Sequence, residues 1–404
     1  MYEIYRIIFK PPSVLIKKIH KLMIIQSKLP NVGTTIFTTM SALAEQHEAI
    51  NLSQGFPNFD TPEELKNFVN LHLQRGMNQY APMAGVLKLR EVLAEKVQTF
   101  YRCTVDPQTE ITITAGGTQG LFTAIAAFIR PDDEVILIEP AYDSYAPSVE
   151  TFGGKVVAYR LAPPQYKIDW AAFAQLITPK TKMIIINTPN NPTGKTLTIN
   201  DLETLDKLTA GTNILVLSDE VYEHLIYDER PHASVLRFPE LFKRSLACYS
   251  FGKTFHATGW KIGYVVAPEP LMREFRKIHQ FNVFSVNTPV QYALADFLED
   301  EDNYLYLSDF YQAKRDFFLE KMATSRLRPL VSEGTYFQLF DYSQISDKND
   351  FEFCKWLTTD IGVAAIPVSV FYTEGAYADE KIIRLCFAKT ENMLEKAAQR
   401  LCEI

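Results

Sequence analysis

Lys253 is the residue whose surroundings first indicate chemistry. It lies in the glycine-rich stretch Ser250–Gly263, which follows Leu246–Tyr249, a short apolar run typical of a β-strand. Glycines in such a stretch let the backbone approach a ligand closely. A lysine in a partly desolvated pocket has a lowered pKa, so its free amine can form a Schiff base with an aldehyde. For Lys253 taken alone, a surface lysine in a tight turn is the plainer explanation, so the rest of the chain has to decide.

Strands and helices alternate through the middle of the chain. Several predicted strands are continuous Ile, Val and Leu runs, which is typical of strands buried on both faces. This alternation predicts an α/β fold with a mostly parallel sheet covered by helices, whose ligands bind at the carboxyl ends of the strands. The predicted strands are residues 111–114, 134–138, 155–159, 182–187, 213–217 and 246–249.

Nearly every one of these strand ends carries a group that could contact a ligand. In chain order the groups are a glycine-rich helix start at Gly117 and Thr118, then Tyr142, Asn191, Asp219 with Tyr222, and Ser250 with Lys253. A glycine-capped helix N-terminus attracts anions through its free N–H groups and its dipole. Taken singly, each group has a plainer explanation in turn chemistry, core packing or helix capping. Taken together, they fit a flat, phosphorylated pyridine aldehyde.

Composition narrows the class of protein. The chain has 404 residues, of which 47% are hydrophobic and 22% charged, as in ordinary soluble globular proteins. Its net charge of −7 argues against nucleic acid as a partner, and no run of about eighteen apolar residues exists to span a membrane. The five cysteines form no C-x-x-C pair, so we expect reduced thiols in the cytoplasm and neither a disulfide framework nor a metal site.

Changes in composition and in the predicted pattern of helices and strands divide the chain into four segments. Residues 1–26 are basic and lack the features of a secretory signal, and they are predicted to be an N-terminal extension that could be disordered. Residues 27–60 are expected to associate with the small domain. Residues 61–300 would form the large ligand-binding domain. The alternation then gives way to a smaller α+β domain over residues 301–404.

The sequence resembles the fold-type I, class I aminotransferases that use pyridoxal 5′-phosphate, from about Ser27 to the C-terminus. The motifs that carry the resemblance share an order and spacing highly specific to that class: Asn190–Gly194, Asp219–Tyr222, Ser250-x-x-Lys253 and Gly259–Gly263. Three further motifs look most like the branch of methionine aminotransferases and kynurenine aminotransferase/glutamine transaminase K: Thr34–Phe37, Ser53–Pro57 and Gln79–Pro82. The resemblance implies a large domain with a mostly parallel seven-stranded sheet covered by helices, and a smaller α+β domain.

The resemblance also implies roles toward the cofactor. Lys253 would hold pyridoxal phosphate covalently and move the substrate proton, and Asp219 would pair with the pyridine nitrogen. The other implied contacts are Asn191 and Tyr222 to the ring oxygen, Tyr142 on the ring face, and Gly117, Thr118, Ser250 and Lys261 to the phosphate. Many relatives have arginine where this chain has Lys261, and a lysine lacks the bidentate fork. Tyr80 would reach the phosphate from the neighbouring subunit, which implies a homodimer with shared active sites.

Arg384 is the implied substrate anchor. A charged residue inside the apolar run Ile382–Phe387 is unfavourable unless it is paired, and the family uses this position for a bidentate bond to the α-carboxylate. The other implied substrate contacts are Gly55 and Asn191, with Phe37, Tyr336 and the partner subunit's Phe284 around the side chain. Aromatic walls favour methionine, phenylalanine, tyrosine or kynurenine as donor, with a 2-oxo acid as acceptor in a ping-pong reaction. No second arginine is evident for a distal carboxylate, which disfavours aspartate.

Three alternatives remain open. A β-lyase acting on cysteine S-conjugates with the same cofactor would share every motif, and only product analysis separates it from a transaminase. Ser250-x-x-Lys253 also matches the nucleophile motif of penicillin-binding proteins, but the Ser-Asp-Asn and Lys-Thr-Gly motifs that should follow it are missing from the sequence. A non-catalytic, cofactor-bound regulator would usually carry a DNA-binding domain, and residues 1–22 are too short to form one.

Overall fold

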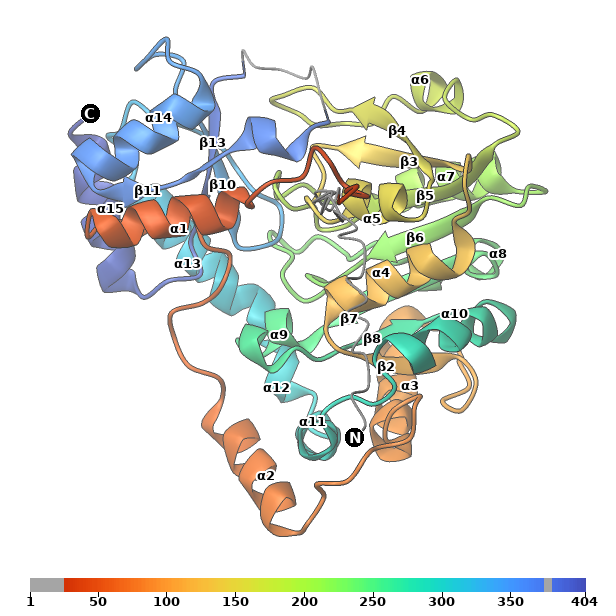
Figure 1. Ribbon diagram of the computed structural model, residues 1–404. Coiled ribbons are helices and arrows are strands. Elements are labelled where there is room, and N and C mark those ends of the chain that lie inside the picture. The colour runs from red at the N-terminus through yellow and green to blue at the C-terminus, as the bar shows by residue number, and fades with distance from the viewer. Residues whose placement is uncertain (1–24, 374–379) are drawn as a thin grey trace, which may run out of the picture.

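The computed structural model describes residues 25–373 and 380–404, so the extension predicted over residues 1–26 lies almost wholly outside the described residues. A seven-stranded sheet organises the described chain (Figure 1). Its strands are β2 (Ile111–Thr114), β3 (Glu134–Glu139), β4 (Lys155–Arg160), β5 (Thr181–Asn187), β6 (Leu215–Asp219), β7 (Ser245–Ser250) and β8 (Gly263–Val266). The strand order is β2-β8-β7-β6-β5-β3-β4. Only β8 runs antiparallel to its neighbours, so the carboxyl ends of the other six strands share one edge.

Helices cover both faces of this sheet, because its central strands are apolar on both sides. Ile184 of β5 faces a cluster shared with the helices α3 (Leu87–Tyr101) and α7 (Ile199–Thr209). Its neighbour Ile185 faces the opposite cluster, which includes α4 (Gly117–Phe128) and α10 (Glu269–Asn282). The result is a three-layered α/β unit, as predicted.

A second sheet lies in the C-terminal part of the chain. It is antiparallel and has the order β12-β13-β10-β9, with β9 (Arg328–Leu330), β10 (Phe337–Asp341), β12 (Ile366–Pro367) and β13 (Ile382–Cys386). The helices around it are α13 (Leu307–Lys321), α14 (Asp350–Trp356) and α15 (Glu391–Cys402). This arrangement is the α+β class that the sequence pattern predicts for the C-terminal residues.

The N-terminal segment lies against this C-terminal unit rather than against the large sheet. The strand β1 (Ile50–Asn51) pairs in parallel with β11 (Val363–Ala364), and in Figure 1 the red helix α1 (Ile36–Gln46) lies beside the blue C-terminal elements. The pairing favours the expected association of residues 27–60 with the small domain. The domain boundaries themselves remain a prediction.

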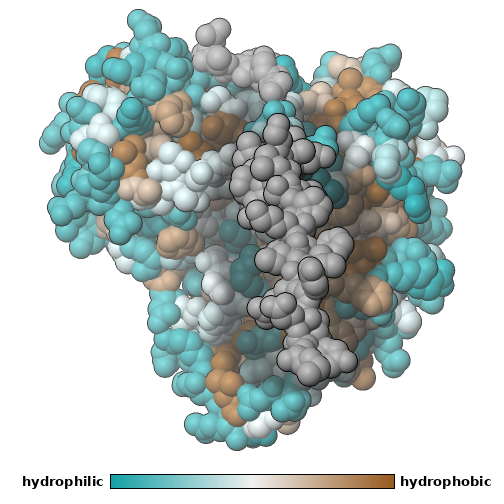
Figure 2. Space-filling view, in the orientation of Figure 1, coloured by the Kyte–Doolittle hydropathy of each residue, from teal (hydrophilic) through white to brown (hydrophobic). Residues whose placement is uncertain are grey.

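The remaining helices are shorter or lie at the periphery: α2 (Glu63–Gln74), α5 (Tyr145–Thr151), α6 (Trp170–Ala174), α8 (Pro239–Phe242), α9 (Phe251–Thr254), α11 (Thr288–Phe297) and α12 (Asp302–Leu305). The stretch around Lys253, predicted as a loop, therefore contains a short helix. On the face shown in Figure 2, hydrophilic side chains predominate and apolar ones form small separate patches. No helix in the described part of the chain is long and apolar enough to cross a membrane.

Candidate active site

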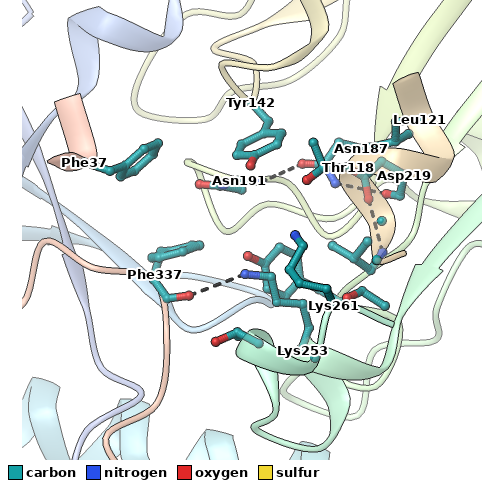
Figure 3. Close-up of a pocket in the computed structure, with 18 of the residues that line it drawn as sticks. Phe37, Thr118, Leu121, Tyr142, Asn187, Asn191, Asp219, Lys253, Lys261 and Phe337 are labelled. Atoms are coloured by element: carbon teal, nitrogen blue, oxygen red, sulfur yellow. Dashed lines mark hydrogen bonds between the residues drawn. The ribbon is translucent and has the colours of Figure 1, made fainter. Parts of the chain in front are cut away.

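Most of the predicted site residues line one cavity of about 300 Å³ at the carboxyl edge of the large sheet (Figure 3). The large sheet and its loops contribute Gly117, Thr118, Tyr142, Asn191, Asp219, Tyr222, Ser250, Lys253 and Lys261. The N-terminal segment and the second sheet contribute Phe37, Gly55 and Arg384. Tyr80, Phe284 and Tyr336 are the predicted site residues that do not line it. The cavity thus lies where the two units and the N-terminal segment meet.

One end of the cavity is suited to an anion. Gly117 and Thr118 begin α4, so their backbone N–H groups and the positive end of the helix dipole face this end. A Cβ atom placed on Gly116 would lie 3.5 Å from Lys261 Nζ, so the ammonium group sits beside the helix start. The Ser250 side chain also borders the cavity here. A helix N-terminus, an ammonium and a hydroxyl together form a site for a phosphate group.

Asp219 provides a buried carboxylate further along the cavity. Its Oδ2 atom accepts a hydrogen bond from the Tyr145 hydroxyl at 2.5 Å, and its Oδ1 atom accepts one from the Val221 backbone N–H at 3.3 Å. Burial raises the pKa of Asp219 to about 6, although both hydrogen bonds oppose that rise. A cationic ring N–H beside this carboxylate would compensate for its desolvation.

Asn187 holds the loop that carries Asn191. Its Nδ2 group donates to the Asp219 carbonyl oxygen at 2.9 Å, and its Oδ1 atom accepts from the Asn191 backbone N–H at 2.8 Å. Asn187 thereby joins the end of β5 to the end of β6 and to the turn after β5 that contains Asn191. This contact positions the Asn191 side chain over the cavity.

Lys253 extends from α9 into the cavity (Figure 3). Its Nζ atom donates to the Tyr336 hydroxyl at 3.1 Å and to the Gly55 carbonyl oxygen at 3.4 Å. Desolvation by burial is the main cause that lowers the pKa of Lys253 to about 8. The ring of Tyr222, itself buried, packs edge-on against Tyr336 with centroids 5.2 Å apart. The amine is therefore held in place and has a pKa near neutral pH, which suits a nucleophile or a base.

Arg384 is a buried cation with an incomplete set of partners. Its Nη1 group donates to Asn191 Oδ1 at 2.6 Å, its Nη2 group donates to the Ser53 carbonyl oxygen at 3.2 Å, and its Nε atom has no hydrogen-bond partner among the described residues. The guanidinium carbon lies 3.9 Å from the Phe337 ring centroid and 5.2 Å from that of Phe37. Burial lowers the pKa of Arg384 to about 10. An entering carboxylate would complete this arrangement.

Phe337, and not the predicted Tyr336, presents its ring to the cavity. The Tyr336 side chain is fully buried, and its hydroxyl donates to the Gly55 carbonyl oxygen at 2.7 Å while accepting from Lys253. The neighbouring residue Phe337 is the one that lines the cavity. Because successive side chains of a strand point to opposite faces, a displacement by one residue changes which ring forms the wall.

Tyr80 and Phe284 lie on the surface of the single chain. Their side chains are 82% and 49% exposed, and their rings meet edge-on with centroids 5.4 Å apart. Phe281, which is 87% exposed, is a third aromatic residue in this part of the sequence. Rings this exposed on a folded chain are unusual and favour a surface that another chain covers.

Tyr145 and Asn187, which hold Asp219 and the Asn191 loop in place, are not among the predicted residues. Tyr145 is the first residue of α5, three positions after the predicted stacking residue Tyr142, and Asn187 is the last residue of β5. The strand-end position of Asn187 is visible in the sequence, whereas Tyr145 lies in the helix after β3 and gives no such signal. Both residues contact Asp219, one through its carboxylate and the other through its backbone. Strand order decides that these segments are neighbours, and the sequence pattern does not give strand order.

The fold and site define an α/β enzyme of the aminotransferase type. The chain belongs to the aminotransferase class I and II family, whose profile matches residues 47–401.

Individual relatives are similar in sequence to nearly the whole of this chain. Methionine aminotransferase of Escherichia coli is 52% identical over 383 residues, which cover 95% of this chain and 99% of that protein. Kynurenine–oxoglutarate transaminase 1 of Mus musculus is 32% identical, over 93% of this chain and 96% of that protein. A crystal structure of an Escherichia coli protein identified as a methionine aminotransferase superposes with a TM-score of 0.91 at 51% identity, covering 95% of this chain and all of that one. These similarities confirm the predicted family, fold class and aminotransferase function.

Proposed function

We propose that this aminotransferase uses pyridoxal 5′-phosphate to move the amino group of methionine or an aromatic amino acid to a 2-oxo acid. One observation carries the proposal: the Lys253 amine, the Asp219 carboxylate and the Arg384 guanidinium border the same cavity. This chemistry requires three groups: an amine that reacts with an aldehyde, a carboxylate that pairs with a pyridine nitrogen, and a guanidinium that binds an α-carboxylate.

The residues of the cavity fit the cofactor. Gly117, Thr118, Ser250 and Lys261 would hold its phosphate at the anion-suited end, and Asp219 would pair with its ring nitrogen. The ring itself would contact Tyr142, Asn191 and Tyr222. When bound, the cofactor supplies an electron sink that stabilises negative charge on the α-carbon of the substrate. The pKa of about 6 at Asp219 supports this fit, since a pyridine N–H is the partner that a desolvated carboxylate lacks.

Arg384 would bind and orient the amino acid through its α-carboxylate. The guanidinium lies against Phe337, so its plane is fixed before the substrate arrives. Asn191 Oδ1 accepts a hydrogen bond from this guanidinium, and Gly55 borders the same cavity. A bidentate bond fixes both the position and the direction of the carboxylate, and the side chain of the substrate then extends toward the aromatic walls.

Lys253 would move the α-proton. With a pKa of about 8, roughly a tenth of the amines are neutral at pH 7, and that fraction rises with pH. The Tyr336 hydroxyl and the Gly55 carbonyl oxygen hold the amine at a fixed place in the cavity. A base held in place in this way can accept a proton from the α-carbon and return it elsewhere.

The walls of the cavity favour an apolar or aromatic donor. Phe37, Phe337 and Tyr142 supply rings, and Arg384 is the only arginine among the described residues that line the cavity. The distal carboxylate of a donor such as aspartate would therefore contact aromatic rings and not a second guanidinium. Methionine fits because its thioether packs favourably against aromatic rings.

The functional unit that we propose is a homodimer in the cytoplasm. Tyr80 would reach the phosphate of the neighbouring site and Phe284 its substrate pocket, and the high exposure of both rings supports such a contact. All five cysteines are free, which supports a reducing compartment.

A visible absorption spectrum of the purified protein tests the proposal. We expect a cofactor band that collapses when L-methionine is added and returns when a 2-oxo acid follows. Lys253→Ala should abolish steady-state transamination. If no band forms even after pyridoxal phosphate is supplied, the cofactor assignment fails. A band that collapses with another amino acid but not with methionine keeps the enzyme class and changes the donor.

Product analysis separates transamination from β-elimination. A transaminase returns each amino group in a new amino acid, whereas a cysteine S-conjugate β-lyase releases ammonia. We expect amino acid product to account for the donor consumed.

A further inference from the structure

We propose that Lys389 is a positioning residue that fixes the substrate-binding loop Ser53–Phe56. It acts through the backbone carbonyl groups of Gln54 and Phe56, and thereby holds Gly55 at the substrate site. The inference rests on the proposed function, because the loop borders the cavity in which the amino acid would bind.

The setting of Lys389 is unusual for a lysine. Its side chain is 2% exposed, and its Nζ atom donates to the Phe56 carbonyl oxygen at 2.7 Å and to the Gln54 carbonyl oxygen at 3.4 Å. The Phe56 ring lies over the ammonium, 4.8 Å from ring centroid to Nζ. Within residues 25–373 and 380–404, no ion pair joins this ammonium to a carboxylate. A buried cation without a counter-charge opposes folding, so a role in the site explains Lys389 better than a role in stability.

The loop that Lys389 holds also contacts the reactive groups. The Ser53 carbonyl oxygen accepts from Arg384 Nη2, and the Gly55 carbonyl oxygen accepts from the Tyr336 hydroxyl and from Lys253 Nζ. Four successive carbonyl groups, those of residues 53–56, therefore accept hydrogen bonds from side chains of distant segments. Lys389 supplies the donor on each side of Gly55.

The loop has little room to move without disturbing the substrate anchor. A Cβ atom on Gly55 would lie 2.7 Å from the Phe337 Cζ atom, so the loop backbone packs directly on that ring. The Arg384 guanidinium also packs on this ring, with its carbon 3.9 Å from the ring centroid. A shift of Gly55 would therefore displace Phe337 and change the plane in which Arg384 meets a carboxylate.

The ends of the loop are anchored by other contacts. The Cys386 backbone N–H donates to the Leu52 carbonyl oxygen at 2.8 Å, and the Thr390 backbone N–H donates to Asn58 Oδ1 at 2.7 Å. Removing the Lys389 ammonium would therefore release the middle of the loop while its ends stay attached. We expect a local loss of substrate grip and not a loss of the fold.

Lys389→Met in the holoenzyme tests this inference, with Lys381→Met as the matched control. Lys381 Nζ also donates to backbone carbonyl groups, those of Asp347 and Lys348, but neither of these two acceptor residues lines the cavity. In single-turnover reactions with L-methionine, we expect Lys389→Met to raise the apparent Kd about tenfold while the maximal rate stays within about threefold. Hydrogen exchange of the peptide covering residues 51–58 should be faster, with the large sheet unchanged. The control should change neither quantity.

Phe56→Ala provides a second variant that does not threaten folding, because the Phe56 side chain is 43% exposed. It uncovers the ammonium and should raise the apparent Kd about threefold. An unchanged Kd in Lys389→Met, unchanged exchange in residues 51–58, or an equal effect of Lys381→Met would overturn the inference. If the wild-type protein transaminates no amino acid, the proposed function fails, while the exchange result still decides whether Lys389 holds the loop.

Discussion

Asp219 and Lys253 show at the scale of single residues how burial prepares the site. Burial raises the pKa of Asp219 to about 6 and lowers the pKa of Lys253 to about 8, so the two values approach each other across neutral pH. The carboxylate is then mostly ionised at pH 7 and the amine is partly neutral. Groups with such displaced pKa values are typical of sites that move protons.

Tyr145→Phe tests the support of Asp219. The Tyr145 hydroxyl stabilises the ionised carboxylate, so its loss should raise the pKa of Asp219 further and move the acid limb of the kcat/KM profile to higher pH. We expect kcat/KM for L-methionine to fall about tenfold at pH 7. Tyr166→Phe is the control, because the buried Tyr166 hydroxyl has no partner among the described residues. An acid limb that does not move would contradict the assigned role.

Lys253→Met should stabilise the cofactor-free protein. As the pH falls from 10.5 to about 8, the unfolded chain binds a proton at Lys253 before the folded chain does, so the lysine opposes folding increasingly over this range. Below about pH 8 the opposition is constant and amounts to at most about 3 kcal/mol. Urea unfolding should therefore show a more stable variant at pH 7 and no difference above pH 10.5. Equal stabilisation at both pH values would contradict the lowered pKa.

At the scale of elements, the end of β6 and the turn after it have two functional faces. Asp219 and Tyr222 face the cavity, whereas Glu223 enters a buried polar network behind it. Glu223 accepts hydrogen bonds from Lys96 Nζ at 2.5 Å and from the Tyr264 hydroxyl at 3.1 Å. Burial alone would raise the pKa of the Glu223 carboxyl. The charge of Lys96 and the other partners have a larger effect in the opposite direction, so they lower this pKa to about 2. The network thereby fixes the segment that carries Asp219 and Tyr222, the two proposed cofactor contacts.

Lys96→Met should destabilise this element strongly. It leaves the Glu223 carboxylate buried without its cation, and loss of one partner of a buried pair typically costs about 3–5 kcal/mol. The double variant Lys96→Met, Glu223→Gln should recover part of that loss, because no charge is then left unpaired. Urea unfolding of the cofactor-free protein measures both. A single variant that loses less than about 1 kcal/mol would show that the pair does not hold the segment.

The elements differ in how far the sequence predicts them. The strands β2 to β7 were predicted to within two residues of their ends, because continuous apolar runs between turn residues admit few other structures. The antiparallel β8 was not predicted, because it has only four residues and begins with Gly263, the last glycine of a stretch that was predicted to be a loop. That glycine is needed because a Cβ atom there would clash with the Tyr249 carbonyl oxygen. The helix α10 was also missed, although Met272, Phe275 and His279 recur at helical spacing.

The site was predicted better for groups at strand ends than for groups whose place depends on tertiary packing. Parallel strands bring their carboxyl ends together whatever their order, which explains why Asp219 and Lys253 line one cavity. The order of the strands decides which side chain supports which, and it brings Tyr145 to Asp219. The contact of Lys389 with the loop before Phe56 joins distant segments and has no periodic pattern.

At the scale of the whole molecule, the proposed sharing of sites between two subunits predicts complementation. Lys253→Ala removes the amine from its own site, and Tyr80→Ala would weaken the phosphate contact in the neighbouring site. Mixing the two variants under conditions of subunit exchange should form hybrid dimers with one intact site. We expect up to about a quarter of the wild-type activity to return. Hybrid dimers that form but stay inactive would show that Tyr80 does not act across the interface.

The pairing of β1 with β11 has a consequence for the order in which a ribosome would build this enzyme. All seven strands of the large sheet lie between Ile111 and Val266, so this sheet can form while later residues are still being translated. β1 emerges before that sheet but has to wait for β11, and Gly55 has to wait for the strand that carries Arg384. The nascent chain would thus acquire its phosphate cradle well before it could hold an amino acid. Until β11 has been translated, β1 has no strand to pair with, so the segment of residues 27–60 is made early but completes its contacts late.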